Sequence, residues 1–391
     1  MQNLAAALSE RKQQQLYRTR QTLDGPQDVV VRIDGREYLS FCSNDYLGLA
    51  NHPLLIEAFK QGIERFGVGS GAAHLITGHS YAHQALEEEL AAFVGRPRAL
   101  LFSTGYMANL GVVSALMGRG GKVFEDRLNH ASLIDAALLS GARLIRYAHK
   151  DIENLHRKVV QTGMAGERLI ASDGVFSMDG DCAPLVDLAA AAAGADAWLL
   201  IDDAHGLGVL GKHGCGWCAD QFAEVPGNTI LMATLGKAFG TFGAFVAGSD
   251  DLIETLIQQA RTFVYTTATP PALAWATRTA LQLVREGDAL REKLSELVRY
   301  FRRGAAELGV PLMPSETPIQ PLPVGDAGAA LALSEALRAQ GILVTAIRPP
   351  TVAKGAARLR ITFSARHERA QLDRLLETLA SCYGKASFAA R

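Results

Sequence analysis

The stretch AWLLIDDAHGLG, residues 197–208, begins with five apolar residues and continues into two aspartates, a histidine and a glycine-containing turn. A strand that is apolar along its whole length is typical of a parallel sheet with helices on both faces. Six further short apolar runs alternate with helical patterns between about residues 50 and 285. The predicted strands are residues 99–103, 122–125, 144–147, 169–172, 198–202, 229–233 and 244–247. The sequence therefore predicts an α/β domain built on a mostly parallel sheet.

The segments on either side of this domain have a different pattern. The first 48 residues predict a helix and then a hairpin, VVVRIDGREYLSF, that turns at Asp34-Gly35. This arm has too little apolar content to fold alone. Beyond residue 286 we expect a helix, short strands around Leu322 and Leu343, a strand at 359–363 and a helix at 368–382. We predict an N-terminal arm (1–48), a large α/β domain (49–286) and a small α+β domain (287–391).

The composition argues against several classes of protein. The 391 residues hold 39 Lys+Arg and 40 Asp+Glu, a formal net charge of -1, without the cationic clusters that nucleic-acid binders need. The longest apolar stretch, residues 188–201, is interrupted by Gly194 and Asp196 and is too short for a membrane helix. The N-terminus lacks the apolar segment of a secretory signal. We expect a cytoplasmic protein that binds neither nucleic acid nor membrane.

The five cysteines are too few, and odd in number, for a disulfide scaffold. Cys215 and Cys218 form a CGWC tetrapeptide, which can be a redox dithiol or half of a zinc site. Because no second cysteine pair lies nearby in the sequence, and His213 alone does not complete a tetrahedral site, we expect ordinary thiols and no metal.

Three strand ends carry residues that suggest chemistry. In TLGKAFG, residues 234–240, Lys237 lies between glycines just after a predicted strand, so a planar ligand could reach it. Asp202 and Asp203 end the strand at 198–202, and His205 follows; a carboxylate at this edge of a parallel sheet points into the ligand crevice. Adjacent carboxylates could instead bind magnesium or cap a helix. Alternation along the strand places them on opposite sides, which disfavours a shared metal.

The third strand end is the stretch ALLFSTGYMANL, where a strand runs through Thr104 and Gly105 into a helix. Such a junction offers free N–H groups and the helix dipole to an anion, although it can also be an ordinary helix cap. Together, an anion site, an acidic strand end and a strand-end lysine on one sheet are the parts that pyridoxal 5'-phosphate (PLP) needs.

The chain resembles the α-oxoamine synthase group of fold-type I PLP-dependent transferases. The resemblance extends from the region of Leu8 to about residue 380. It rests on the motifs SNDYLGL, GSG, HQALEEELA, LNHAS, DGVFSMDGD, IDDAHG, TLGKAFG, YTTATPP and IRPPTV, which occur in this order. The resemblance implies a homodimer with shared active sites, a large PLP-binding domain, an N-terminal arm and a small C-terminal domain.

The resemblance also implies roles for individual residues. Lys237 would hold the cofactor covalently and act as the base, Asp202 would pair with the ring nitrogen, and His205 would bond to the ring hydroxyl oxygen. His130 would stack on the ring and contact the substrate. The other cofactor contacts implied are Gly105, Tyr106, Ser177, Thr234, and, from the neighbouring subunit, Thr266 and Thr267. The substrate contacts implied are Arg360 and Asn44 for the amino-acid carboxylate, and Arg18 and Thr351 for the acyl group.

The branch that the chain resembles most condenses L-alanine with a pimeloyl thioester to 8-amino-7-oxononanoate, with loss of CO2, in biotin biosynthesis. The thioester could be carried by coenzyme A or by an acyl carrier protein. Glycine C-acetyltransferase, 5-aminolevulinate synthase, an aminotransferase and a pyridoxal-binding regulator are the alternatives. The regulator is disfavoured because the sequence shows no helix-turn-helix segment or basic arm.

Some residues depart from the group's pattern or stay without a role. Asp173 stands where the group usually has glutamate, so any hydrogen bond of that carboxylate must be remade. His74 stands where relatives often have arginine. Arg348, in IRPPTV, could contact the far end of the acyl group or the phosphates of the carrier, or could pair with a surface carboxylate.

Overall fold

The computed structural model describes residues 3–389, and within them the chain forms two compact units. The larger unit holds residues 49–177 and 182–291, and the smaller one holds the N-terminal residues up to Gly48, residues 178–181 and the chain from Glu292 onward. The boundary at 291 falls inside helix α12 (Asp288–Glu307). The division into arm, large domain and small domain stays a prediction.

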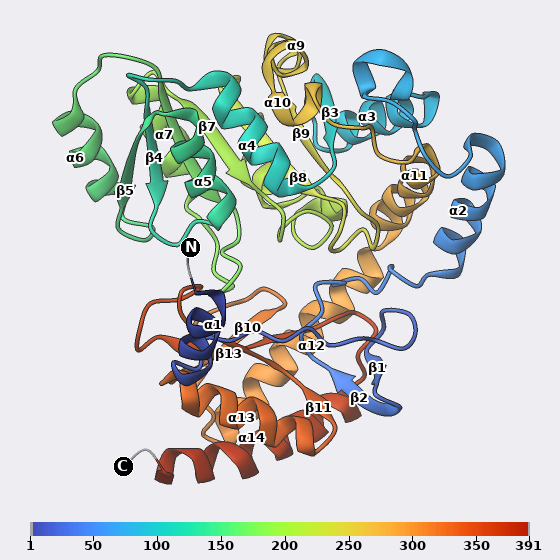
Figure 1. The fold of residues 1–391 in the computed structure, drawn as a ribbon, viewed down its shortest axis with the longest axis vertical. Coiled ribbons are helices and arrows are strands. Elements are labelled where there is room, and N and C mark those ends of the chain that lie inside the picture. The colour runs from blue at the N-terminus through green and yellow to red at the C-terminus, as the bar shows by residue number, and fades with distance from the viewer. Residues whose placement is uncertain (1–2, 390–391) are drawn as a thin grey trace. The chain divides into compact units, whose positions relative to one another are not determined.

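A seven-stranded sheet forms the centre of the larger unit (Figure 1). The strand order is β3-β9-β8-β7-β6-β4-β5, and β9 runs antiparallel to both of its neighbours while the other neighbouring pairs are parallel. The predicted mostly parallel sheet is thus confirmed, and each predicted strand lies within one residue of an observed one. The strands are β3 (Arg98–Phe102), β4 (Lys122–Asp126), β5 (Arg143–Tyr147), β6 (Arg168–Asp173), β7 (Trp198–Asp202), β8 (Thr229–Thr234) and β9 (Ala244–Gly248).

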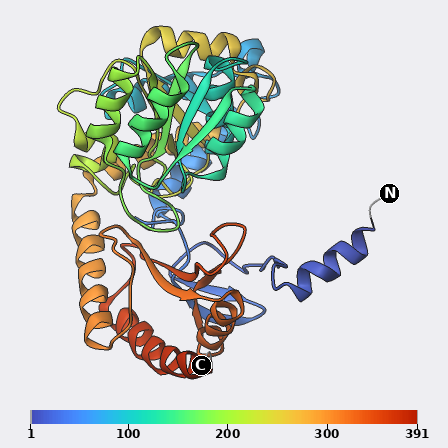
Figure 2. The same ribbon diagram turned by 90° about the vertical axis from the view of Figure 1, so that its left-hand side faces the viewer.

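Helices cover both faces of this sheet, as Figure 2 shows. Leu199, Leu200 and Ile201 follow one another in β7 and point alternately to the two faces, yet all three are 0% exposed. Leu200 belongs to a buried cluster with residues of α4, α5 and α9, whereas α7 packs against β6 and β7 without joining that cluster. The helices are α4 (Gly105–Leu116), α5 (Ala131–Ser140), α6 (Ile152–Thr162), α7 (Leu185–Gly194), α9 (Asp250–Gln259) and α10 (Arg261–Val264).

A second group of helices in the larger unit packs around α11. Helix α11 contacts α2 and α3, and the approach to α2 is close: a Cβ at Gly62 would lie 2.9 Å from the main chain of Ala272. A single π-helical turn, η1, precedes α3. Helices α2 (Pro53–Phe66), α3 (Tyr81–Phe93) and η2 (Lys212–Gly214) contact α11 (Pro271–Glu286), whereas η1 (His74–Gly78) contacts α10 and α8 (Trp217–Gln221) contacts α7. Among the described residues, no helix has the length and apolar character that crossing a membrane requires.

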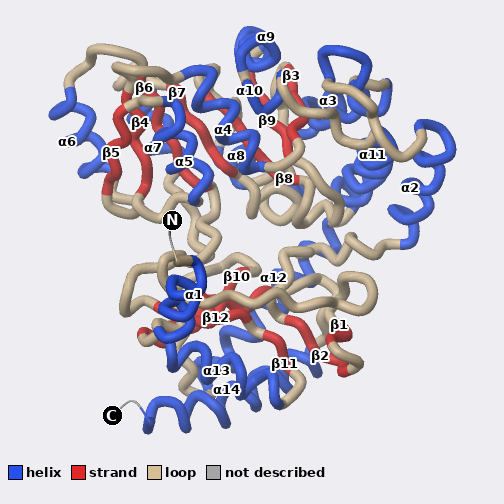
Figure 3. Tube along the Cα trace, in the orientation of Figure 1, coloured by secondary structure: helices blue, strands red, loops and turns tan. Residues whose placement is uncertain are grey.

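The smaller unit holds two three-stranded sheets, of order β1-β2-β11 and β10-β13-β12 (Figure 3). The predicted hairpin turn is present, with Asp34 and Gly35 both at positive φ (51° and 74°). Strand β2 pairs in parallel with β11, so the N-terminal hairpin is completed by the C-terminal part of the chain. The elements are α1 (Leu4–Gln13), β1 (Val30–Ile33), β2 (Arg36–Ser40), β10 (Ile319–Gly325), α13 (Ala327–Ala339), β11 (Ile342–Leu343), β12 (Thr345–Ile347), β13 (Ala357–Thr362) and α14 (Arg369–Ala389).

Helix α13 and strand β12 were absent from the sequence prediction. The helix starts at Asp326, whose carboxylate accepts a hydrogen bond from the Ala329 N–H (2.9 Å), so an N-cap signal was present in the sequence. Strand β12 has three residues and lies at the edge of its sheet, which leaves almost no periodic pattern to detect.

Candidate active site

The predicted cofactor lysine follows β8, next to the strand that ends in Asp202. Strands β7 and β8 are parallel neighbours with Asp202 opposite Met232, and Lys237 lies three residues beyond the end of β8. The Lys237 Nζ atom lies 2.8 Å from His205 Nε2. The Thr234 hydroxyl donates to the Gly243 carbonyl (2.9 Å). This hydroxyl holds the loop that carries Lys237.

The Asp202 carboxylate begins a buried chain of hydrogen bonds that leads to His130. Asn109 Nδ2 donates to Asp202 Oδ2 and to Ser132 Oγ, both at 2.8 Å, and Ser132 Oγ lies 2.8 Å from His130 Nδ1. The Ala204 N–H donates to the other carboxylate oxygen (3.1 Å). The chain therefore joins two of the predicted cofactor residues through Asn109 and Ser132.

Asn109 and Ser132 were missed by the sequence reasoning. Asn109 is 0% exposed and lies one turn inside α4, in the otherwise mostly apolar stretch GYMANLGVVSAL. An asparagine in the buried face of a helix needs hydrogen-bond partners, and that was the available signal. Its Oδ1 atom has no hydrogen-bond partner among the described residues.

Asp203 is separate from this network, as the alternation along β7 predicted. Its Oδ2 atom accepts a hydrogen bond from the Cys218 N–H (3.1 Å) in the first turn of α8, so this carboxylate caps the following segment. A Cβ at Gly206 would overlap Asp203 Oδ1, which explains a glycine there. Burial raises the pKa of Asp203 to about 7.

Asp173, which is shorter than the glutamate usual in the group, has a hydrogen-bond partner within the chain. Asp173 Oδ1 accepts a hydrogen bond from the His130 N–H (3.1 Å), and so fixes the main chain that carries the imidazole. Burial, and next the charge of Asp202, raise the pKa of Asp173 well above its usual value.

The remaining predicted cofactor residues lie elsewhere in the larger unit. The Thr104 hydroxyl accepts a hydrogen bond from the Met107 N–H (3.1 Å), so α4 begins at Gly105 with a side-chain cap. The Tyr106 hydroxyl donates to Asp135. Ser177 is buried, Thr266 is partly buried, and Thr267 is exposed and forms a bridge with Ala73.

The predicted carboxylate-binding arginine lies in the smaller unit. Arg360 in β13 is buried, and it donates to Asn44 Oδ1 (3.1 Å) and to the Tyr46 hydroxyl (3.4 Å). Asn44 therefore lies beside Arg360 as predicted. Tyr46 is an additional residue that the sequence reasoning did not include.

The predicted acyl-binding residues line one pocket of the smaller unit, with a volume of about 610 Å³. Arg18 donates to the Thr351 hydroxyl (3.4 Å) at this pocket. Arg348 donates to the main-chain carbonyls of Gln15 and Tyr17, and no carboxylate pairs with it among the described residues. Burial, and next the charge of Arg18, lower the pKa of Arg348. The pocket therefore presents two neighbouring guanidinium groups.

The donor set of the larger unit fits PLP. The cofactor needs an amine for covalent attachment, a carboxylate for its ring nitrogen and N–H donors for its phosphate. Asp202 ends β7 and Lys237 follows the end of the neighbouring parallel strand β8, and the N-terminal turn of α4 lies in the same unit. The bonds from Asn109 and Ala204 hold the Asp202 carboxylate in one orientation.

Comparison with known proteins agrees with this geometry. Residues 36–379 match the model of the family "Aminotransferase class I and II". An 8-amino-7-oxononanoate synthase from Nitrosococcus oceani is 63% identical over 372 residues, which cover 95% of this chain and 98% of the relative. The chain belongs to the 8-amino-7-oxononanoate synthase family. It is a PLP-dependent enzyme of fold type I.

Solved structures of the same fold include members of this family and of a related one. An 8-amino-7-oxononanoate synthase from Francisella tularensis has a TM-score of 0.78 at 31% identity, covering 90% of this chain and 99% of its own. A serine palmitoyltransferase from S. paucimobilis, with PLP and myriocin bound, has a TM-score of 0.92 at 27% identity, covering 98% of both chains.

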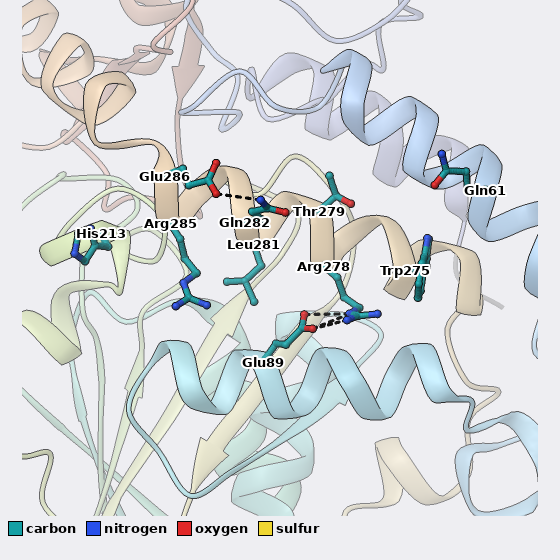
Figure 4. Close-up of a pocket in the computed structure, with 10 residues that line it drawn as sticks. All are labelled: Gln61, Glu89, His213, Trp275, Arg278, Thr279, Leu281, Gln282, Arg285 and Glu286. Carbon is teal, nitrogen blue, oxygen red and sulfur yellow. Dashed lines mark hydrogen bonds and ion pairs between the residues drawn. The ribbon is translucent and has the colours of Figure 1, made fainter.

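A pocket of about 740 Å³ in the larger unit is lined by none of the residues predicted for the family's site (Figure 4). It is lined mainly by α11, with Gln61 of α2 and Glu89 of α3. Glu89 accepts hydrogen bonds from Arg278 (3.0 Å), and Arg278 also lies over the Trp275 ring. Glu89 and Arg278 thus pair with each other, and we assign the pocket no chemistry.

Proposed function

We propose that the enzyme condenses L-alanine with a pimeloyl thioester in the cytoplasm, giving 8-amino-7-oxononanoate, CO2 and a free thiol for biotin biosynthesis. The observation that carries the proposal is the position of Asp202 at the end of β7 and of Lys237 just after the neighbouring strand β8, in a chain 63% identical to an 8-amino-7-oxononanoate synthase. Neither coenzyme A nor an acyl carrier protein is favoured by the residues described.

Lys237 is the residue to which we assign attachment of the cofactor and proton transfer at Cα of alanine. Bound PLP supplies an aldehyde for covalent attachment and a ring that accepts electrons from Cα. With alanine bound to PLP in place of Lys237, the lysine amine would be free to remove the Cα proton. His205 Nε2 lies 2.8 Å from this amine. With a proton on Nε2 the imidazole donates to the lone pair of the neutral amine, and without one it accepts from an amine N–H.

Asp202 and His130 are assigned to the cofactor ring. Asp202 keeps the ring nitrogen protonated, and the hydrogen bonds from Asn109 and Ala204 limit the motion of its carboxylate. His130 would contact the ring of bound PLP; its imidazole is oriented by Ser132 and its main chain by Asp173. The buried network thus supports both residues.

Arg360 is assigned to the carboxylate of alanine. A planar guanidinium donates two parallel hydrogen bonds to a carboxylate, and the contacts of Arg360 with Asn44 and Tyr46 fix its plane. The basic pocket with Arg18, Arg348 and Thr351 is assigned to the pimeloyl group. Attack of Cα on the thioester releases the thiol; the alanine carboxylate then leaves as CO2, and Lys237 returns a proton to Cα.

Substrate preference tests this function. With a pimeloyl thioester, we expect kcat/KM for L-alanine to exceed that for glycine by about 10–200-fold, because that is the range that one methyl group contributes in an apolar pocket. The measurement is kcat/KM for alanine and glycine, each with pimeloyl, acetyl and succinyl thioesters, using mass analysis of the product. Pimeloyl-coenzyme A and pimeloyl-acyl carrier protein are compared as separate donors. A preference for glycine with a short donor would assign the enzyme to a sister activity.

We also propose a homodimer in which Thr266 and Thr267 contact the cofactor phosphate bound by the other subunit. Dimers formed by mixing Lys237→Ala chains with Thr266→Ala/Thr267→Ala chains should regain activity, to about a quarter of the sites, because half the dimers are mixed and each has one intact site. The measurement is activity after subunit exchange, with each variant alone as control. Activity no higher than the sum of the two controls, or a monomer at micromolar concentration, contradicts this arrangement.

A further inference from the structure

Three histidines come together at the start of α3, beside the segment that carries Thr266 and Thr267, since Ala73 forms a bridge with Thr267. They are His74 in the π-helical turn η1, His79 just after it and His83 in the first turn of α3. One ring nitrogen from each lies within 4.8 Å of the others. His74 and His83 are buried and His79 is exposed, so the cluster is reachable from solvent on one side.

The hydrogen bonds determine which nitrogens carry protons in two of the rings. The Gln84 amide nitrogen donates a hydrogen bond to Glu88 (2.7 Å), which leaves Gln84 Oε1 facing His79 Nε2 at 3.2 Å. Because this oxygen can only accept, the His79 proton is on Nε2. His83 Nδ1 accepts a hydrogen bond from the Ser80 N–H (3.0 Å), so its proton is on Nε2 and is donated to the Thr269 carbonyl (2.8 Å). Both rings therefore have a lone pair on Nδ1.

The third ring lies close to one of these lone pairs. His74 Nδ1 is 3.0 Å from His79 Nδ1. Two nitrogens that each lie about 2.0–2.1 Å from one tetrahedral or square-planar ion have a similar separation. Without an ion, one of these atoms must carry a proton for the pair to be favourable. With an ion, the His74 proton moves to Nε2. His83 Nδ1 then exchanges its contacts with the Ser80 N–H and the Ser80 hydroxyl, both at 3.0 Å, for the metal.

We propose that His74, His79 and His83 form a binding site for a divalent transition-metal ion, with Zn²⁺ as the ion it fits best. Three imidazole nitrogens favour Zn²⁺ or its neighbours over Mg²⁺ and Ca²⁺, which prefer oxygen ligands. Water completes a four-coordinate Zn²⁺ on the exposed side of His79.

The surroundings already contain outer hydrogen-bond acceptors for two of the three proposed ligands, His79 and His83. Ligating imidazoles usually donate their second N–H to a carboxylate, carbonyl or amide oxygen. The Thr269 carbonyl does this for His83 and Gln84 Oε1 for His79, while Glu87 Oε2 lies 3.9 Å from His79 Nε2.

The alternative is a hydrogen-bonded aromatic cluster, in which His74 stacks on Phe263 (5.0 Å between ring centroids).

Metal titration of the complete PLP-loaded enzyme distinguishes a metal site from a hydrogen-bonded aromatic cluster. After metal removal, equilibrium dialysis against buffered Zn²⁺ should give one tightly bound ion per chain. His79→Ala should weaken binding by more than about 10–100-fold, the range for losing an outer-sphere group alone. His79 is exposed, so this variant should fold. His156→Ala, an exposed histidine of α6, and Cys215→Ser should bind Zn²⁺ like the unchanged enzyme.

Cobalt gives an independent readout of the ligands. Co²⁺ should produce visible ligand-field bands, recorded as a difference from the His79→Ala enzyme, without the sulfur-to-cobalt charge-transfer bands of a thiolate site. The proposal is overturned if Zn²⁺ fails to bind, which leaves a hydrogen-bonded cluster only, or if His79→Ala binds it unchanged. Loss of binding in Cys215→Ser would overturn it too, by placing the ion at the CGWC segment.

Discussion

Lys237→Ala is expected to lower kcat by about 10²–10⁴-fold or more, the range that a positioned proton-transfer group contributes. The variant loses both the covalent attachment of PLP and the amine that removes the Cα proton of alanine. The fold should persist, because Lys237 lies in a turn after β8 and its side chain does not belong to the hydrophobic core.

Two measurements separate this role from a general effect of losing a lysine. Borohydride reduction followed by peptide mapping should place the cofactor on Lys237 in the unchanged enzyme and on no lysine in the variant. Lys212→Ala removes an exposed lysine of the same unit and should change kcat by less than about twofold, as is usual for surface positions. A cofactor label on another lysine, or a variant with normal kcat, would contradict the assignment.

The fold could be predicted because burial on both faces leaves a simple pattern in the strands. Leu199, Leu200 and Ile201 had to be apolar together, since each face of β7 is covered by helices. The hairpin at Asp34-Gly35 was equally readable, because the turn requires two residues that tolerate positive φ. Strand β12 could not be predicted, because three residues at the edge of a sheet are too few to show the alternation of a strand.

The candidate site was predictable only as far as single residues reveal their chemistry. Lys237 and Asp202 stand out by their place at strand ends. The bond from Asn109 to Asp202 joins residues 93 positions apart, and no local pattern encodes it. The histidine cluster was equally hidden, because the π-helical turn η1, and not α-helical spacing, brings His74 beside His79.

Asp202→Asn should lower kcat by about 10–10³-fold, because a contacting carboxylate shifts the pKa of its partner by about 1–3 units and each unit is a factor of ten in protonation. Asparagine keeps the shape of the side chain, so the hydrogen bond from the Ala204 N–H can remain. Exchange of the Cα hydrogen of alanine in deuterated water, measured without thioester, isolates this proton transfer from carbon–carbon bond formation. Exchange at the normal rate would contradict the role of Asp202.

No neighbouring carboxyl group is expected to supply the negative charge that the Asp202→Asn variant loses. Asp173 is the nearest further carboxyl group of the network, but burial is the largest cause of its raised pKa and remains when Asp202 loses its charge. Asn109→Ala provides the matched comparison: it removes one hydrogen bond to Asp202 and leaves both the carboxylate charge and the bond from Ala204. Its exchange rate should therefore fall less than that of Asp202→Asn. Equal losses in the two variants would mean that orientation, and not charge, is what Asp202 contributes.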